Sequence, residues 1–488
     1  MNINLKLPRL LAFGLALAAL PSSLSAAETA RAESRQPNIV VILGDDLGYA
    51  DIGANGGKEI PTPHIDSLAR NGVRFTSGYV SGPYCSPTRA ALLTGRYQQR
   101  FGHEFNPGGP QATNRTEVGL ALTEVTVADR LKAAGYRTGL VGKWHLGYAD
   151  KFHPLERGFD EFFGFLGGAH SYTNLDVTGP DPIQRGRQAV EEKEHLTDAF
   201  TREAVAFIER HRQQRFFLYL AYNAVHNPLE PAPKHLERVK HIADEKRRRF
   251  AALLAGLDDG VGAVLAKLHD AGLERDTLVV FFTDNGGPTA GNTSRNDPLR
   301  GFKATTWEGG IRVPFIVQWR GHLPEGRTQD RPIIQLDILP TVLAAAGVTV
   351  RPEWKLDGVN LLPFLTSANA GTPHEALYWR FGQQLAIRQG DWKLVKGNAP
   401  GRNLGAAAGP DAVATTEGAE LYHLATDIGE TNNLATKEPA KFRELADAWN
   451  AWNVGLVPAS WTPPAQQAGR QQARASRDVQ RAPSPQAQ

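Results

Sequence analysis

Acidic and amide side chains follow two apolar runs that are predicted as strands. Asp45 and Asp46 follow the first run, Asn38–Leu43 (NIVVIL), after a single glycine. Asp284 and Asn285 come directly after another, TLVVFFT. Because the carboxyl ends of parallel strands meet at one edge of a sheet, these side chains should converge. Either pair alone is typical of a turn. Together, three carboxylates and an amide oxygen predict a site for a hard cation, Ca²⁺ or Mg²⁺ rather than Zn²⁺.

Basic and imidazole side chains follow the ends of further predicted strands or lie in a neighbouring loop. They are Lys143, His145, His226, Arg300 and Lys303. Taken one at a time, each is typical of a surface cation or of a structural histidine. Gathered at the same sheet edge, they would suit a small tetrahedral oxyanion, whose negative charge they could stabilise.

The only cysteine of the chain, Cys85, opens the segment Cys85–Arg96 (CSPTRAALLTGR). Pro87 is favourable in the first turn of a helix, so Cys85 is expected at a helix amino terminus, where backbone N–H groups stabilise negative charge. Arg89 follows four residues later and could help to hold an anion. A lone cysteine can also be an inert buried thiol, but this surrounding predicts a nucleophile beside an oxyanion site.

The segment Cys85–Arg96 closely resembles the maturation signature of the type I sulfatases, members of the alkaline phosphatase superfamily. In that family a maturation enzyme oxidises the cysteine to formylglycine. Thr88 stands where many members have Ser or Ala, and maturation is still expected. The resemblance implies one Ca²⁺ per chain, with the ligands Asp45, Asp46, Cys85, Asp284 and Asn285. It implies that sulfate binding and proton transfer are carried out by Arg89, Lys143, His145, His226 and Lys303.

The resemblance also implies a reaction cycle. The aldehyde at position 85 is hydrated to a diol held on Ca²⁺, and one hydroxyl attacks sulfur with help from Arg89. His226, together with Lys303, protonates the departing alcohol. His145 then removes a proton from the second hydroxyl, which expels sulfate and restores the aldehyde.

Two other functions remain open. Phosphatases and phosphonate monoester hydrolases of the same superfamily share the metal site, but the phosphatases usually use Ser or Thr and a second metal, for which the sequence offers no further ligand cluster. A non-catalytic glycan-binding protein on this scaffold would be expected to lose its nucleophile or metal ligands, and none is lost.

The substrate is expected to be a sulfated carbohydrate, such as a fragment of an algal galactan like carrageenan. Polar and aromatic loop residues suit a sugar, although such residues are also typical of ordinary loop surface. The predicted substrate-binding residues are Arg100, His103, His170, Asn174 and Arg300.

The composition and the termini bear on partners and location. The formal net charge is +3, but the amino-terminal and carboxyl-terminal segments carry more positive charge than this. The body between them is therefore slightly acidic, and nucleic acid is not an expected partner. Residues 1–27 have the pattern of a signal peptide, with Lys6 and Arg9 before an apolar run too short to span a membrane. The protein is expected to be exported, periplasmic or secreted, without a membrane anchor.

Apolar strand-like runs alternate with helical patterns, which predicts an α/β fold with a large, mostly parallel or mixed sheet sandwiched by helices, alkaline-phosphatase-like. The catalytic domain is expected at 28–365. A smaller α+β subdomain with an antiparallel sheet is expected at 366–463, because a hairpin pattern there precedes a helix. The remainder, 464–488, is rich in Gln, Ala, Arg and Pro and is expected to be disordered.

Overall fold

The computed structural model describes residues 1–3, 36–112, 115–366, 371–397 and 414–461. Residues 1–36 and 37–488 are two separate compact units, and the fold described below is that of the second. Most of the predicted signal peptide and the whole predicted tail lie outside the described residues. Among the described residues, no helix is long and apolar enough to cross a membrane.

A ten-stranded mixed sheet forms the centre of the second unit, with the strand order β11-β2-β10-β9-β1-β8-β4-β5-β6-β7. The five neighbours β9, β1, β8, β4 and β5 are parallel, and β10 is antiparallel to both β9 and β2. The bounds are β1 Asn38–Gly44, β2 Val73–Phe75, β4 Arg137–Lys143, β5 Glu161–Phe165, β6 Gln184–Arg185, β7 Gln188–Ala189, β8 Phe216–Ala221, β9 Thr277–Thr283, β10 Phe315–Gln318 and β11 Arg327–Gln329. A separate two-stranded sheet pairs β3 (Gly78–Tyr79) with β12 (Ile333–Ile334).

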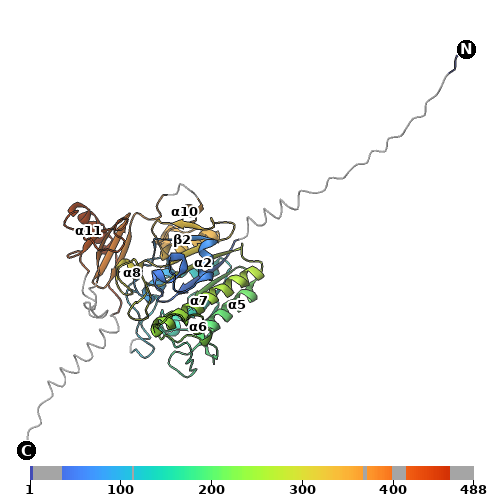
Figure 1. The fold of residues 1–488 in the computed structure, drawn as a ribbon, viewed down its shortest axis with the longest axis horizontal. Helices are drawn as coiled ribbons and strands as arrows, with labels where there is room; N and C mark the ends of the chain where they lie inside the picture. Colours follow the sequence, from blue (N-terminus) through green and yellow to red (C-terminus); the bar gives the residue numbers. More distant parts are fainter. Residues whose placement is uncertain (4–35, 113–114, 367–370, 398–413, 462–488) are drawn as a thin grey trace, which may run out of the picture. The chain divides into compact units, whose positions relative to one another are not determined.

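Helices cover both faces of the large sheet. Every residue of β1 is buried, as expected for a parallel strand packed on two sides. Val40 and Ile42 point into the apolar cluster that includes α5 and α7, whereas Ile39 and Val41 point into the one that includes α3, α4 and α9. Figure 1 shows α5 and α7 running side by side. The helix bounds are α2 Pro63–Arg70, α3 Cys85–Thr94, α4 Val127–Ala133, α5 Leu196–His211, α6 Pro233–Arg238, α7 Glu245–Asp270, α8 Glu308–Ile311, α9 Ile338–Ala345, α10 Leu362–Thr366 and α11 Pro439–Val454.

One predicted strand is wrong at its beginning. The apolar pattern predicts a strand over 311–318, but Ile311 ends the short helix α8 and the strand β10 begins only at Phe315. The cause is local: Gly309 and Gly310 lie against the backbone of Gly301 and Thr305 more closely than a side chain would allow. The chain therefore makes a compact turn of helix there before it enters the sheet.

A four-stranded antiparallel sheet, β13-β14-β15-β16, follows in the last part of the chain. Its strands are β13 Leu377–Phe381, β14 Gln384–Gln389, β15 Trp392–Lys396 and β16 Glu420–His423. The helix α11 packs on β14 and β15 (Figure 1). The predicted hairpin and helix are thus confirmed, while the domain boundary at residue 365 stays a prediction.

A buried charged cluster joins this small sheet to α8. Lys393 of β15 places its Nζ 2.8 Å from Oε1 of Glu308 and 2.8 Å from Oε1 of Glu430, and all three side chains are inaccessible to solvent. The Lys393→Met variant would leave the buried carboxylate of Glu430 without its cation and that of Glu308 with Arg312, whose Nη1 lies 3.2 Å from Oε2. We expect it to lower the free energy of unfolding by about 3–5 kcal/mol in urea denaturation.

The matched control is Lys396→Met, on the same strand but partly exposed, which should change stability by less than about 0.5 kcal/mol. Loss of the cation raises the pKa of the two glutamates in the folded state. The folded Lys393→Met protein then binds more protons than the unfolded chain. Its loss in free energy of unfolding, relative to wild type, should therefore shrink as the pH falls. An equal loss in the free energy of unfolding for Lys393→Met and Lys396→Met would contradict this role of Lys393.

Candidate active site

Three strand ends and one helix bring the predicted acidic and basic residues together. Asp45, just after β1, contacts the Nζ of Lys143 at the end of β4. Arg89 on α3 lies between two carboxylates, with its Nη2 2.8 Å from Oδ2 of Asp284 and 3.3 Å from Oδ2 of Asp45. All four side chains are fully buried. Arg89 therefore holds Asp45, which follows β1, and Asp284, which follows β9, at fixed positions relative to each other.

Three more residues of the predicted site contact the carboxylate of Asp46. The Nζ of Lys303 lies 2.7 and 2.9 Å from its two carboxylate oxygens. The amide of Asn285 donates to Oδ1 of Asp46 at 2.7 Å, and Nε2 of His226 lies 3.6 Å from Oδ2. The expected convergence of strand ends is thus present in the structure.

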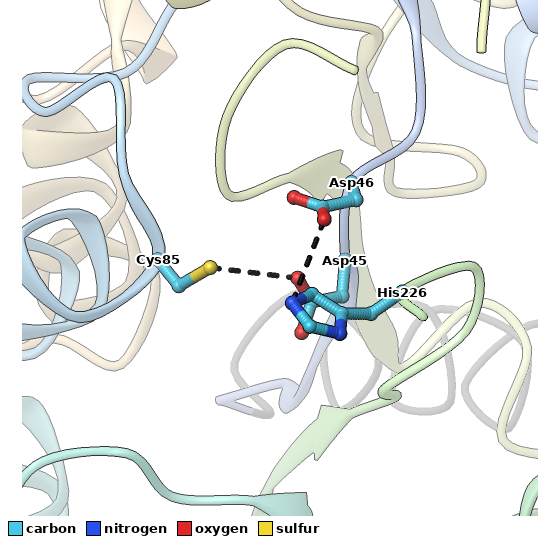
Figure 2. A group of neighbouring side chains, drawn as sticks. All are labelled: Asp45, Asp46, Cys85 and His226. Atoms are coloured by element: carbon cyan, nitrogen blue, oxygen red, sulfur yellow. Dashed lines mark hydrogen bonds and ion pairs between the residues drawn. The ribbon is translucent and has the colours of Figure 1, made fainter. Parts of the chain in front are cut away.

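Cys85 is the first residue of α3, and Tyr84 before it has extended backbone. Its Sγ lies 3.2 Å from Nζ of Lys303 and 3.7 Å from Oδ1 of Asp45. Figure 2 shows the thiol directed at the carboxylate of Asp45. Burial raises the pKa of the Cys85 thiol to about 12. The unmodified side chain would therefore be a neutral thiol at neutral pH, and a neutral thiol is a weak nucleophile.

The donor atoms fit a hard cation. Ligand atoms of Asp45, Asp46, Cys85 and His226 all lie within 4.8 Å of one another. The Oδ1 of Asn285 is buried and has no hydrogen-bond partner, although buried polar atoms nearly always have one. Carboxylate and amide oxygens are the ligands that Ca²⁺ prefers. A cation among these residues would supply that partner.

Burial by itself would raise the pKa of the Asp45 and Asp46 carboxyl groups. Their cationic neighbours, chiefly Lys143 for Asp45 and Lys303 for Asp46, outweigh burial and lower both pKa values. Both residues are therefore ionised at neutral pH. The site offers ionised oxygen ligands together with the buried ammonium groups of Lys143 and Lys303, which could attract an anion.

The two histidines of the site are neutral at rest. Burial lowers the pKa of His145 well below its usual value, and nearby cations add to this shift. Burial also lowers the pKa of His226, although the carboxylates of Asp46 and Asp45 partly oppose the shift. Nδ1 of His226 lies 2.7 Å from the carbonyl oxygen of Asn227, so Nδ1 carries the proton and Nε2 faces the carboxylate of Asp46. Nε2 is therefore the atom of His226 that can exchange a proton with a ligand in the site.

His145 is placed by a close backbone approach. A Cβ at position 168 would lie 2.5 Å from Nε2 of His145, so only a glycine fits beneath the imidazole. His145 itself has a positive φ of 59°, and its Nδ1 is buried without a partner. The ring is thus held between Gly168 and the cationic groups of the site.

Most of the predicted substrate-binding residues have partners within the protein. Arg100 pairs with Asp357 at 2.6 Å. Arg300 lies over the ring of Trp307 and donates to the carbonyl of Glu430.

Both ring nitrogens of His170 contact backbone carbonyls, and His103 is fully buried beside Ser86. Asn174 is exposed. Substrate binding by these residues stays a prediction. The partners that four of them have within the protein argue against direct contact with substrate: Arg100, His103, His170 and Arg300.

The sequence interpretation missed how the amino terminus of α3 is held, since it assigned His103 to substrate binding. The backbone N–H of Ser86 donates to Oδ1 of Asn106 at 3.0 Å. The Ser86 hydroxyl donates to the carbonyl of His145 at 2.7 Å and therefore accepts from Nε2 of His103, 2.6 Å away. A polar residue directly after the cysteine was the only local signal for this network.

Comparison with known proteins identifies the family. The family model named Sulfatase matches residues 37–348. The N-acetylgalactosamine-6-sulfatase of Mus musculus is 34% identical over 81% of this chain and 81% of its own length. The Arylsulfatase J of Mus musculus is 32% identical over 89% of this chain and 79% of its own length. The chain belongs to the sulfatase family and is a sulfuric ester hydrolase.

Solved structures agree with this assignment. The crystal structure of Ps i-CgsB in complex with k-i-k-neocarrahexaose superposes with a TM-score of 0.80 at 32% identity and covers 90% of this chain and 98% of that one. The PsFucS1 sulfatase from Pseudoalteromonas sp. has a TM-score of 0.73 at 27% identity, with 89% of this chain and 93% of that one covered. The phosphonate monoester hydrolase of Agrobacterium radiobacter, at 18% identity and a TM-score of 0.58, shares the fold.

Proposed function

We propose that this sulfatase removes sulfate from a sulfated carbohydrate by means of a formylglycine at position 85 and one bound Ca²⁺. The observation that carries the mechanism is the position of Cys85. Its side chain begins α3, lies between Lys303 and Asp45, and faces buried carboxylates that are ionised. A site of this kind combines a nucleophile position, cations for the sulfate oxygens and oxygen ligands for a metal.

Two relatives support a carbohydrate substrate. One is described as an N-acetylgalactosamine-6-sulfatase, and the other was solved with a carrageenan-type hexaose. Because the second superposes over 90% of this chain, we extend the substrate class to sulfated sugars, and to a carrageenan-like galactan in particular. Arylsulfatase J favours testing a nitrophenyl sulfate as a small surrogate.

When bound, Ca²⁺ supplies Lewis acidity and charge stabilisation, held by Asp45, Asp46, Asp284, Asn285 and the oxidised side chain at position 85. Oxidation of Cys85 supplies an oxygen nucleophile in place of the neutral thiol. Side chains of the protein supply the charge stabilisation, positioning and proton transfer. Lys143 and Lys303 offset negative charge on the sulfate oxygens, and Arg89 keeps Asp45 and Asp284 in position. Nε2 of His226 faces the same cluster; once it has taken up a proton, such as the one released by the attacking hydroxyl, it can donate that proton to the leaving oxygen.

The direct test is release of inorganic sulfate, followed by ion chromatography. Purified protein that was co-expressed with a formylglycine-generating enzyme should desulfate defined carrageenan oligosaccharides and, more slowly, N-acetylgalactosamine 6-sulfate. Phosphonate monoesters, which carry one negative charge as sulfate esters do, serve as the charge-matched control, and phosphate monoesters test for phosphatase activity. Faster hydrolysis of those esters than of every sulfate ester would overturn the proposal in favour of a phosphatase or phosphonate hydrolase.

His226 and His145 are expected to differ in their dependence on the leaving group. A sugar alkoxide needs a proton far more than a nitrophenolate does, and acid catalysis contributes about 10²–10⁴-fold. His226→Ala should therefore lose much more activity on a sulfated sugar than on nitrophenyl sulfate. His145→Ala should slow both substrates alike, because it is assigned to the release of sulfate, which both share. Equal losses for both variants on both substrates would contradict this division of roles.

Export to the periplasm or the medium is part of the proposal. It rests on the charged and apolar pattern of residues 1–27. Amino-terminal sequencing of protein recovered from the periplasm should show that chains begin near residue 28. Recovery of uncleaved chains from the cytoplasm alone would contradict it.

A further inference from the structure

The last described segment of the chain returns to the loop that follows α3. After α11, the N–H of Val457 donates to the carbonyl of Gln99 at 3.2 Å, and the N–H of Ser460 donates to the carbonyl of Gly102 at 2.9 Å. Gly102 has a φ of 74°, and a Cβ there would lie 2.2 Å from Oγ of Ser460. The segment 457–461 is therefore fitted closely against the loop 97–106.

Trp461 ends this segment with two specific contacts. Its indole Nε1 donates to the backbone carbonyl of Asn106 at 3.0 Å. Its ring packs edge-to-face on the imidazole of His103, with 4.7 Å between the ring centroids and 83° between the planes. Both partners are 355 or more residues away in sequence, so the Trp461 side chain adds to the links between the carboxyl-terminal part of the protein and the loop 97–106.

The two partners of Trp461 are the residues that hold Ser86. Oδ1 of Asn106 accepts the backbone N–H of Ser86, and Nε2 of His103 donates to the Ser86 hydroxyl. Burial lowers the pKa of His103 to about 3, so this imidazole stays neutral and keeps a single N–H for that bond. Ser86 directly follows the nucleophile position in the first turn of α3.

We infer that Trp461 is a positioning residue that fixes the nucleophile at position 85 through Asn106 and His103. This inference rests on the proposed function. Release of either partner would let the first turn of α3 shift relative to Asp45 and Lys303. A displacement of about 1 Å in a reacting group can cost on the order of 10²-fold in rate. Substrate affinity should change little, because the contacts of Trp461, with Asn106, with His103 and with the apolar cluster of Phe105, Ala304 and Phe381, all lie within the protein.

The experiment compares two tryptophans in matched surroundings. Trp319 is also partly buried, donates its indole N–H to a backbone carbonyl, that of Arg275, at 3.2 Å, and stacks on a histidine, His322. It has no hydrogen bond to the site. Trp461→Ala should lower kcat on nitrophenyl sulfate by about 10- to 100-fold per mature active site, with KM within about twofold. Trp319→Ala should leave both constants near wild type at a similar loss of thermal stability.

Two further variants separate positioning from general damage. Trp461→Phe keeps a ring against His103 and loses the N–H, so it should recover part of the lost kcat. Asn106→Ala removes one of the two links to Ser86, so the combined loss in Trp461→Ala/Asn106→Ala should be smaller than the product of the single losses. Equal falls in kcat for Trp461→Ala and Trp319→Ala, or a kcat within twofold of wild type for Trp461→Ala, would overturn the inference.

Amide hydrogen exchange tests the positioning role of Trp461 by a measurement that does not depend on enzyme activity. The amides of the first turn of α3 should exchange faster in Trp461→Ala than in wild type and Trp319→Ala, because Ser86 loses the support of its acceptor. If the wild-type protein hydrolyses no sulfate ester, the proposed function fails, and the exchange measurement alone decides whether Trp461 holds this turn. Unchanged exchange there would overturn the positioning role.

Discussion

A Cys85→Ala variant is expected to fold and to lose turnover on every sulfate ester. Removal of the nucleophile of another hydrolase lowers kcat by about 10⁶-fold, and a fall of at least about 10⁴-fold is expected here. The thiol is only 1% exposed and small, so its loss should lower stability by no more than about 1–2 kcal/mol. Sulfate release and urea denaturation measure the two effects separately.

The matched control is a variant on the same helix that is less stable but keeps the nucleophile. Leu92 of α3 is buried in the core, and Leu92→Ala should cost about 2–5 kcal/mol while kcat falls far less than in Cys85→Ala. Cys85→Ser should also be inactive, since serine brings one hydroxyl where the hydrated aldehyde has two. A serine variant that hydrolyses phosphate monoesters well would favour the phosphatase alternative.

The chemical state of position 85 is measured directly by mass spectrometry. The tryptic peptide that contains Cys85 should be found in the lighter formylglycine form, in proportion to specific activity across preparations. Full activity in protein that carries only the unmodified thiol would contradict the proposed mechanism. The buried thiol, with its raised pKa, makes such a result unexpected.

Much of the sheet could be predicted from local pattern alone. The apolar runs at 216–221 and 277–283 predict two strands, and the structure has β8 and β9 with the same bounds, because parallel strands buried on both faces consist almost wholly of apolar residues. The convergence of Asp45, Asp46 and Asp284 followed from the same pattern. Ligands gather where the carboxyl ends of parallel strands meet, and polar residues after such strands therefore point to a site.

Residues that act through distant partners could not be predicted in this way. Trp461 contacts Asn106, and no local periodicity relates positions so far apart. Arg89 was expected to hold the substrate anion, yet its guanidinium is shared between Asp284 and Asp45. The interpretation of Arg100 as a substrate contact likewise did not foresee Asp357. Each depends on which side chains the folded chain places nearby, and charge or residue type alone does not decide that.

Loss of the Asp46 carboxylate is expected to remove both the metal and the activity. Asp46 contacts Lys303, Asn285 and His226, so it lies at the centre of the proposed ligand set. Mutation of residues that merely support metal ligands typically costs about 10–100-fold in affinity or activity. Asp46→Asn keeps the size of this direct ligand but removes its negative charge, so the loss in Ca²⁺ affinity and in kcat should exceed about 100-fold.

Elemental analysis and calcium titration after chelation measure the metal, with one Ca²⁺ per wild-type chain expected. The control is Asp258→Asn, in the other group of potential ligands that the described residues contain, His64, Asp258 and Asp259. Asp258 accepts hydrogen bonds from the backbone N–H groups of His64 and Ile65, so its substitution should lower stability and leave bound calcium and kcat near wild type.

Calcium retained in Asp46→Asn would contradict the ligand set. Zinc, or two metals per wild-type chain, would instead favour phosphatase chemistry, because soft or paired metal sites do not arise from a single oxygen cluster of this kind.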